Sequence, residues 1–293
     1  DLVGDRTEVN VTGLVASPDC ELVYAVVPRL GVLRCDNRLW SGVSPQGEMA
    51  RSFTIALSGS TVLVGGKFGI RYSVADQSDT WVKPLSPTPV DEEVLSLVRS
   101  DGRIYAAVWG DGPWYCHKDN LDMWHPENDG LDTTKVLQVV GSPADGAPRF
   151  AVADNTLFRW NGIRWEKGPE TWDETPISWV VTDGVTAYAG LELDGVLRSS
   201  DGGLTWEQMN AGWEPPFGVH TLLIHVAEDG RQWLYAGTSD GVWRYLLGKA
   251  PICNGDFEQD FDCWQHGGEL DQTVECYGDQ CYAVLGKPDY PCY

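Results

Sequence analysis

Short apolar runs, each of strand length, recur from the N-terminus to about residue 249 and are separated by turn-forming Gly, Asp, Asn and Ser. Such runs between turn signals are typical of β-strands. They follow a fixed order: an apolar strand, a strand rich in Tyr, Ala and Gly, and a third strand that reads GVLR at residues 31–34 and again at 195–198. Six copies of this order start near Val11, Phe53, Val94, Val136, Ile177 and His220.

Tryptophans follow the same period. They are separated by 41, 43, 41 and 41 residues and lie at Trp40, Trp81, Trp124, Trp165 and Trp206. Repeat units of about 42 residues with four strands are typical of β-propeller blades. We therefore predict an all-β, six-bladed β-propeller over residues 1–249. Its blades are expected near 11–52, 53–93, 94–135, 136–176, 177–219 and 220–249.

The last repeat is incomplete, because residues 220–249 contain three strand-like segments and no tryptophan at the periodic position. An unpaired outer edge would be left open. We therefore predict that a strand within residues 1–10, near Glu8–Val11, is the outer strand of the sixth blade.

The segment SSDGGLTW forms the best-defined turn in the chain. Its pattern predicts that the Asp carboxylate accepts backbone N–H groups, that the glycines have φ > 0, and that the Trp is buried between neighbouring sheets. The motif resembles the Asp-box, or bacterial neuraminidase repeat, of sialidase-like β-propellers. The structural residues that this resemblance implies are Ser199, Asp201, Gly203, Thr205 and Trp206.

The resemblance also bears on whether the chain is a sialidase. Sialidases of this type use three arginines, a Tyr–Glu nucleophile pair and an acid/base Asp. Here only Arg29 and Arg51 are expected on the relevant face, and the early Arg-Ile-Pro signature is missing. The sequence therefore argues against sialidase activity and leaves a glycoside hydrolase with a carboxylate pair as a lesser alternative. Its candidate carboxylates are Asp111, Asp154, Glu192 and Asp240.

Loops opposite the Asp-box-like turns carry aromatic and charged residues. Aromatic rings next to polar groups are suited to sugar or glycoprotein ligands. The candidate ligand-binding residues are Arg29, Lys67, Trp109, Trp172, Trp213 and His220.

The balance of 43 acidic against 21 basic residues, a net charge of −22, argues against nucleic acid and anionic membrane surfaces as partners. No apolar run reaches the ~20 residues of a membrane span, so membrane insertion is not expected. We expect no cofactor or metal site, although acidic turns such as Asp119–Asp122 could hold calcium.

Eight cysteines and a glycosylation sequon at Asn10 predict a secreted or cell-surface protein. A Cys20–Cys35 disulfide is expected, which leaves Cys116 to pair with the tail or with another chain. The alternative is a buried free thiol at Cys116. The remaining cysteines lie in the tail at Cys253, Cys263, Cys276, Cys281 and Cys292.

Residues 250–293 depart from the repeat. Asn254–Glu258, followed by Cys263 and Trp264, resembles the first strand of galactose-binding-like jelly rolls in carbohydrate-binding modules. The segment is too short for a whole jelly roll, so we expect a partial, cysteine-rich one.

Together these features predict a non-catalytic extracellular subunit of a fibre or surface layer. Its tail is expected to add a strand to another copy or to another surface protein. The alternative is a propeller that binds polysaccharide or glycoprotein.

Overall fold

The computed structural model describes most of the repeats and little of the tail. It covers residues 11–17, 22–36, 39–44, 49, 51–74, 80–85, 92–142, 149–168, 175–211, 213, 217–227 and 231–247, and the backbone of 265–266, 275–277 and 280–282. The regular elements among these residues are β-strands. No helix long and apolar enough to cross a membrane occurs in this part of the chain.

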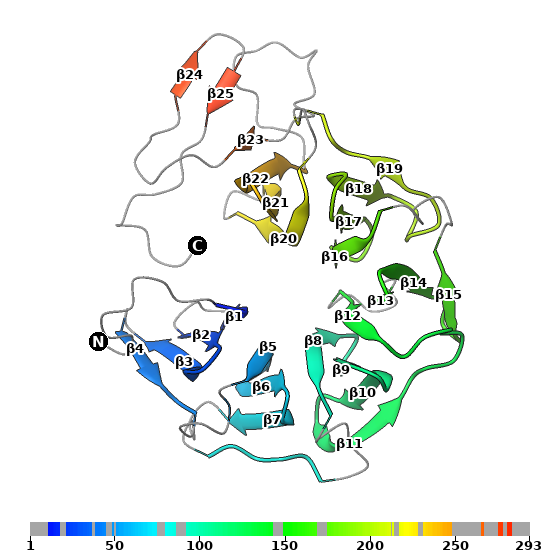
Figure 1. Cartoon of the computed structure of the whole chain (residues 1–293). Coiled ribbons are helices and arrows are strands. Elements are labelled where there is room, and N and C mark those ends of the chain that lie inside the picture. The colour runs from blue at the N-terminus through cyan, green and yellow to red at the C-terminus, as the bar shows by residue number, and fades with distance from the viewer. Residues whose placement is uncertain are drawn as a thin grey trace. The chain divides into compact units, whose positions relative to one another are not determined.

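The chain divides into two compact units, residues 1–168 and 169–293. Unit one contains four sheets (Figure 1). Their strands are β1 (Gly13–Ala16), β2 (Leu22–Val27), β3 (Gly31–Asp36), β4 (Leu39–Gly42), β5 (Ser52–Ser58), β6 (Thr61–Gly66), β7 (Gly69–Val74), β8 (Val94–Ser100), β9 (Arg103–Val108), β10 (Gly112–His117), β11 (Asn120–Pro126), β12 (Val136–Val140), β13 (Arg149–Ala153), β14 (Thr156–Trp160) and β15 (Trp165–Lys167).

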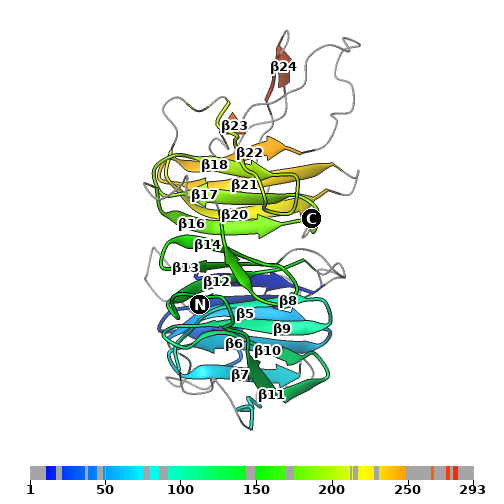
Figure 2. The same ribbon diagram turned by 90° about the vertical axis from the view of Figure 1, so that its right-hand side faces the viewer.

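Unit two contains two such sheets and a short hairpin in the tail. Figure 2 shows strands of both sheets from the side. The strands are β16 (Ile177–Thr182), β17 (Ala187–Leu191), β18 (Val196–Ser199), β19 (Glu207–Gln208), β20 (Val219–Val226), β21 (Gln232–Thr238), β22 (Gly241–Leu246), β23 (Gln265–His266), β24 (Glu275–Tyr277) and β25 (Gln280–Tyr282).

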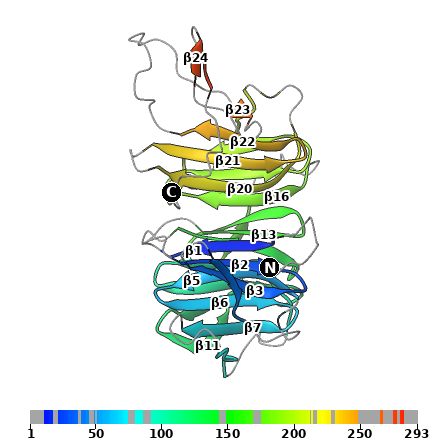
Figure 3. The same cartoon turned by 90° about the vertical axis from the view of Figure 1, so that its left-hand side faces the viewer.

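Each large sheet is an antiparallel meander in which consecutive strands pair, as the repeated strand–turn pattern predicts. In β5–β7 the fourth position is reduced to a single bridge between Tyr72 and Val82. First strands of consecutive sheets contact each other within a unit: β1 with β5, β5 with β8 and β8 with β12 in unit one, and β16 with β20 in unit two. Figure 3 shows the strands of the first two sheets running alongside one another. The six sheets are the blades of an all-β, six-bladed β-propeller.

The outer position of blade six is occupied by β23. This strand pairs with β22 through Arg244 opposite Gln265 and Trp243 opposite His266. The sequence assigned this position to a strand within residues 1–10, which lie outside the described residues. A strand from the following segment satisfies the same need to pair the outer edge of β22. The hairpin β24–β25 and β23 are the described parts of the tail, and the partial jelly roll stays a prediction.

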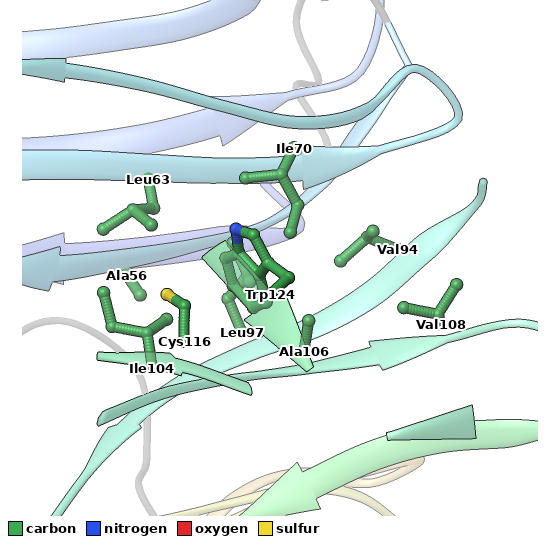
Figure 4. Packing of buried hydrophobic residues seen from close by; sticks show 10 residues of the cluster. All are labelled: Ala56, Leu63, Ile70, Val94, Leu97, Ile104, Ala106, Val108, Cys116 and Trp124. Carbon is green, nitrogen blue, oxygen red and sulfur yellow. The ribbon is translucent and has the colours of Figure 1, made fainter. Parts of the chain in front are cut away.

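Apolar side chains of neighbouring blades interlock to form the core. Between blades two and three, the fully buried Trp124 lies among Ile70 of blade two and Leu97 and Ala106 of blade three (Figure 4). A buried indole removes a large apolar area from water and contributes about 2–3 kcal/mol. The periodic tryptophan therefore joins adjacent blades here, as the sequence predicts.

The same position behaves differently in other blades. The indole N–H of Trp165 donates to Glu127 O of the preceding blade at 2.6 Å, and that of Trp81 donates to Val43 O at 2.7 Å. Trp40 in blade one is 44% exposed, so this position is not covered in every blade.

The turn between β18 and β19 has the geometry that SSDGGLTW predicts. The Asp201 carboxylate accepts the Thr205 hydroxyl at 2.6 Å and the Thr205 N–H at 2.9 Å, and Ser199 Oγ accepts the Gly203 N–H at 2.8 Å. Gly203 has φ of 89°. These donors, led by the Thr205 hydroxyl, hold the pKa of Asp201 well below its usual value. Trp206, predicted to be buried between neighbouring sheets, is only half-buried, and its indole N–H donates to Gly203 O at 3.2 Å within the turn.

Candidate ligand-binding face

Antiparallel connectivity puts two kinds of segment at the same end of each blade: the turn between the second and third strands, here called the inner turn, and the blade-to-blade loop. We call this end the loop face and describe it separately for each unit. The Asp-box-like turn lies at the opposite end of its blade. The candidate ligand-binding residues that the structure describes fall on the loop face.

A backbone hydrogen bond fixes the inner turn in five blades. The N–H just after the second strand donates to the carbonyl group just ahead of the first strand. The pairs are Lys67 to Arg51, Trp109 to Glu93, Asp154 to Lys135, Glu192 to Pro176 and Ser239 to Gly218, at 2.8–3.3 Å. The first strand of each of these blades also has a bulge near this end. The side chains of the loop face therefore project from a fixed backbone.

A side chain from the segment after the outer strand also fixes the inner turn. In blade five, Asn210 Oδ1 accepts the Val196 N–H at 2.9 Å, and Asn210 Nδ2 donates to Asp194 O at 2.9 Å. Gly195 has φ of 74°, and a Cβ there would lie 2.2 Å from Asn210 Oδ1, so only glycine fits. Ser44 in blade one likewise accepts the Val32 N–H at 3.0 Å.

The inner turn of blade three presents an exposed indole. Trp109 is 40% exposed, its backbone N–H donates to Glu93 O at 2.8 Å, and its backbone forms a β-bridge with Lys135. The Glu93 side chain also faces Lys67 of blade two, with Nζ and Oε2 3.9 Å apart. The structure thus brings two predicted residues, Lys67 and Trp109, to the same acidic residue. Sequence reasoning missed Glu93 and Lys135, although their place just ahead of a first strand was a usable signal.

Arg29 projects from the inner turn of blade one. Its φ of 73° is in the left-handed region, which costs a residue with a Cβ roughly 1–2 kcal/mol. The next residue, Leu30, packs against Ala25, Val27 and Leu33. This packing compensates for the strained backbone and leaves Arg29 exposed at the tip.

The remaining predicted ligand-binding residues do not form one site. Trp213 is 2% exposed and packs edge-on against Trp243 and Phe217, so it is a core residue and cannot stack on a ligand. The error arose because an aromatic residue in a loop can fold inward as readily as outward. His220 is exposed at the bulge of β20, and Trp172 lies outside the described residues.

The four candidate carboxylates come from four different blades. Asp111 accepts the Trp114 indole N–H at 3.0 Å, and Asp154 has φ of 47° at an exposed turn. Glu192 and Asp240, in unit two, are also exposed. A glycosidase acid usually lies in an apolar pocket that favours its protonated form. Asp154, Glu192 and Asp240 are exposed instead.

The acidic residues considered for calcium have protein partners. Lys118 Nζ donates to both carboxylate oxygens of Asp119, at 2.7 and 2.9 Å. Asp122 Oδ1 accepts the Tyr72 hydroxyl at 3.3 Å and the Leu85 N–H at 3.1 Å, which links blades two and three. Within the described ranges, no three His, Cys, Asp or Glu side chains cluster as metal ligands.

Cys35 and Cys116 form no disulfide among the residues that the structure describes. The predicted Cys20–Cys35 disulfide stays a prediction, because Cys20 lies outside the described residues. Cys116 matches the alternative of a buried thiol, and burial raises its pKa to about 12. The backbones of Cys276 and Cys281 face each other in β24–β25. Asn10, Cys253, Cys263 and Cys292 lie outside the described residues.

Solved structures of low sequence identity share the architecture. An extracellular domain from B. thetaiotaomicron matches with a TM-score of 0.67 and 14% identity over 91% of this chain and 34% of that chain. YCF48 bound to D1 peptide matches with a TM-score of 0.64 and 17% identity over 86% and 82% of the two chains. The β-propeller domain of Myceliophteria thermophila Cps50 (Swd1) gives 0.63 and 10% identity over 82% and 84%.

At these identities the likeness establishes the β-propeller fold. The chain spans about a third of the length of the B. thetaiotaomicron protein. No family model and no curated protein sequence matches it.

Proposed function

We propose that the chain is a non-catalytic, extracellular binding propeller that holds a protein partner on the loop face of unit one. The observation that carries this proposal is Trp109, an exposed indole on a turn fixed by backbone hydrogen bonds and adjacent to the Lys67–Glu93 pair. Rigid aromatic anchors next to charged groups are typical of binding hot spots, because little side-chain entropy is lost when they are covered.

Two further observations support the proposal. One propeller of similar fold and length is described as bound to a peptide, and another similar chain is an extracellular domain. The sequon at Asn10 and the cysteine content of the sequence are in keeping with a location outside the cell. The exposed carboxylates, each from a different blade, support binding over hydrolysis.

Carbohydrate binding is the second candidate, because an exposed indole also stacks on sugar rings. The exposed Trp109 supports a sugar ligand as well as a peptide. Of the two other tryptophans expected to line such a site, Trp213 is in the core and Trp172 lies outside the described residues. A peptide array and a glycan array, each probed with the wild-type chain and with Trp109→Ala, separate the two. Trp40→Ala is the matched control, since Trp40 is 44% exposed and lies on β4, the outer strand of blade one.

We expect peptides that bind the wild-type chain and the Trp40→Ala variant but are lost with Trp109→Ala. Binding to glycans alone, with the same dependence on Trp109, would replace the protein partner by a carbohydrate. Binding to neither array, or binding that ignores Trp109, would overturn the proposed site.

The assembly hypothesis concerns the tail. Of its described strands, β23 pairs with β22 of the same chain, and β24 pairs with β25. These pairings give three tail strands partners within their own chain. Strand addition to another copy therefore has less support than binding at the loop face.

A further inference from the structure

Three basic residues from consecutive segments project from the loop face of blades one and two. Arg29 lies on the inner turn of blade one, Arg51 lies just ahead of β5, and Lys67 lies on the inner turn of blade two. All three are exposed. We call these residues the cationic triplet.

Backbone contacts bring the three segments together. The Lys67 N–H donates to Arg51 O at 3.1 Å, which joins the second and third members of the triplet. The turn that carries Arg29 ends at Gly31, where a Cβ would lie 3.7 Å from Met49 O, two residues before Arg51. The three segments are therefore neighbours, and the bond between Lys67 and Arg51 is one of those that fix the inner turns.

The positive charge of the triplet is largely uncompensated among the residues that the structure describes. Lys67 faces Glu93 at 3.9 Å, with 49% and 33% of the two side chains exposed, which makes a weak pair. The ion pairs in the described ranges include neither Arg29 nor Arg51. Arg99 and Arg164, also exposed, likewise form none of these ion pairs, whereas Arg149 and Arg198 have acidic partners.

The two arginines of the triplet, which form none of the ion pairs in the described ranges, give it its binding capacity. Arg29 and Arg51 retain their capacity for charge-assisted, bidentate hydrogen bonds to a carboxylate. The chain as a whole is acidic, with 43 acidic and 21 basic residues. Extended polyanions and anionic membranes would be repelled by the remaining charge, whereas a short acidic segment could approach the triplet alone.

We propose that the cationic triplet is the docking site for a short acidic segment of a partner polypeptide, with an apolar residue of that segment placed on Trp109. The Glu93 side chain faces Lys67, and its carbonyl oxygen accepts the backbone N–H of Trp109, so the residue that carries the indole lies next to the Lys67 end of the triplet. This inference rests on the proposed function and adds the chemistry of the partner to it.

The test uses fluorescence anisotropy with the full chain and a fluorescein-labelled peptide of glutamates ending in leucine. A peptide with glutamine in place of glutamate is the charge control, and a hyaluronan fragment is the acidic sugar control. The test variant is Arg29→Gly combined with Arg51→Ser, because glycine accepts the left-handed backbone and keeps the turn folded. Arg164→Ser, at an exposed turn of blade four, is the matched control.

We expect the glutamate peptide to bind the wild-type chain and Arg164→Ser equally, and to bind the double variant roughly five- to tenfold more weakly, as the loss of two exposed ion pairs implies. The difference should shrink as salt is raised. Wild-type binding that is absent, that the glutamine peptide matches, or that the double variant retains would overturn the inference. Binding of hyaluronan in place of the peptide would overturn it too.

Trp109→Ala separates this inference from the proposed function. If binding of the array peptides depends on Trp109 but not on Arg29 and Arg51, the proposed binding face is supported and the proposed acidic partner is rejected. If neither change affects any bound peptide, both proposals fail.

Discussion

At the scale of single residues, Asp201 shows how one carboxylate defines a turn. Its oxygens accept the hydroxyl and the N–H of Thr205, the N–H of Leu204 and the hydroxyl of Ser199. These bonds favour the charged form, so the pKa of Asp201 lies below its usual 3.8. The stabilisation is fully present above the unfolded-state pKa and is lost as the pH falls toward the lower pKa of the folded state.

Replacement of Asp201 by Asn should therefore lower Tm at pH 7, because the amide NH2 group cannot accept the Thr205 donors. The difference in Tm from the wild-type chain should narrow as the pH falls below about 4. Thermal unfolding followed by circular dichroism between pH 2 and 8 checks this. Asp154→Asn, at an exposed inner turn, is the control at pH 7 and should leave Tm unchanged. A gap in Tm that stays constant down to pH 2 would contradict the assignment.

At the scale of elements, two asparagines hold equivalent inner turns with different numbers of hydrogen bonds. Asn210 accepts from Val196 N–H and donates to Asp194 O. Asn128 donates to Asp111 O at 2.9 Å, but its Oδ1 is buried without a partner. The residue equivalent to Val196 in blade three is Pro113, which has no N–H to donate.

Replacement of Asn210 by Ala should therefore destabilise the chain more than Asn128→Ala. The expected difference in the free energy of unfolding is about 1 kcal/mol, the contribution of one hydrogen bond. Urea unfolding of the two variants measures it. Equal losses would mean that the extra bond of Asn210 contributes nothing.

A buried ion pair joins blades three and four. Both Arg149 and Glu127 have side chains only 9% exposed, and Arg149 Nη2 lies 3.2 Å from Glu127 Oε1. The guanidinium also lies over the Tyr105 and Trp160 rings, at 4.5 and 4.8 Å. Removal of one partner leaves a buried charge without compensation, which typically costs 3–5 kcal/mol.

Glu127→Gln should accordingly lower the free energy of unfolding by about 3 kcal/mol, since the amide keeps part of the hydrogen bonding. Glu207→Gln is the matched control, because Glu207 forms an exposed pair with Arg198 at 3.7 Å. That change should cost less than about 0.5 kcal/mol. Urea unfolding of both variants measures the two changes in the free energy of unfolding. Similar decreases for the two variants would contradict a larger contribution from the buried pair.

The strands and turns could be predicted from the sequence where the same local pattern of residues repeats along the chain. The tryptophan period and the turn residues specified six antiparallel blades and the Asp201 turn. Burial could not be predicted where it depends on the neighbouring element: Trp40 and Trp124 hold the same repeat position, yet one is 44% and the other 0% exposed. Trp213 is buried because Trp243 and Phe217 pack against it. The residue types of a loop do not show which other side chains the loop will contact.

At the scale of the whole molecule, the remaining alternative is assembly into a fibre. Light scattering of the native chain, with and without reductant, should give a single species near the chain mass of 32.3 kDa, because β23 and the hairpin β24–β25 have partners within the chain. A large species that dissociates when reductant is added would instead support assembly through disulfides of the tail cysteines.

Binding of a partner polypeptide at the loop face of unit one can be tested by hydrogen–deuterium exchange of the chain with and without the tightest peptide from the array. We expect slower exchange in the inner turns of blades one to three, around Arg29, Lys67 and Trp109, and no change at the opposite turns around Ile163 and Leu204. Protection at those opposite turns, with the inner turns unaffected, would contradict it.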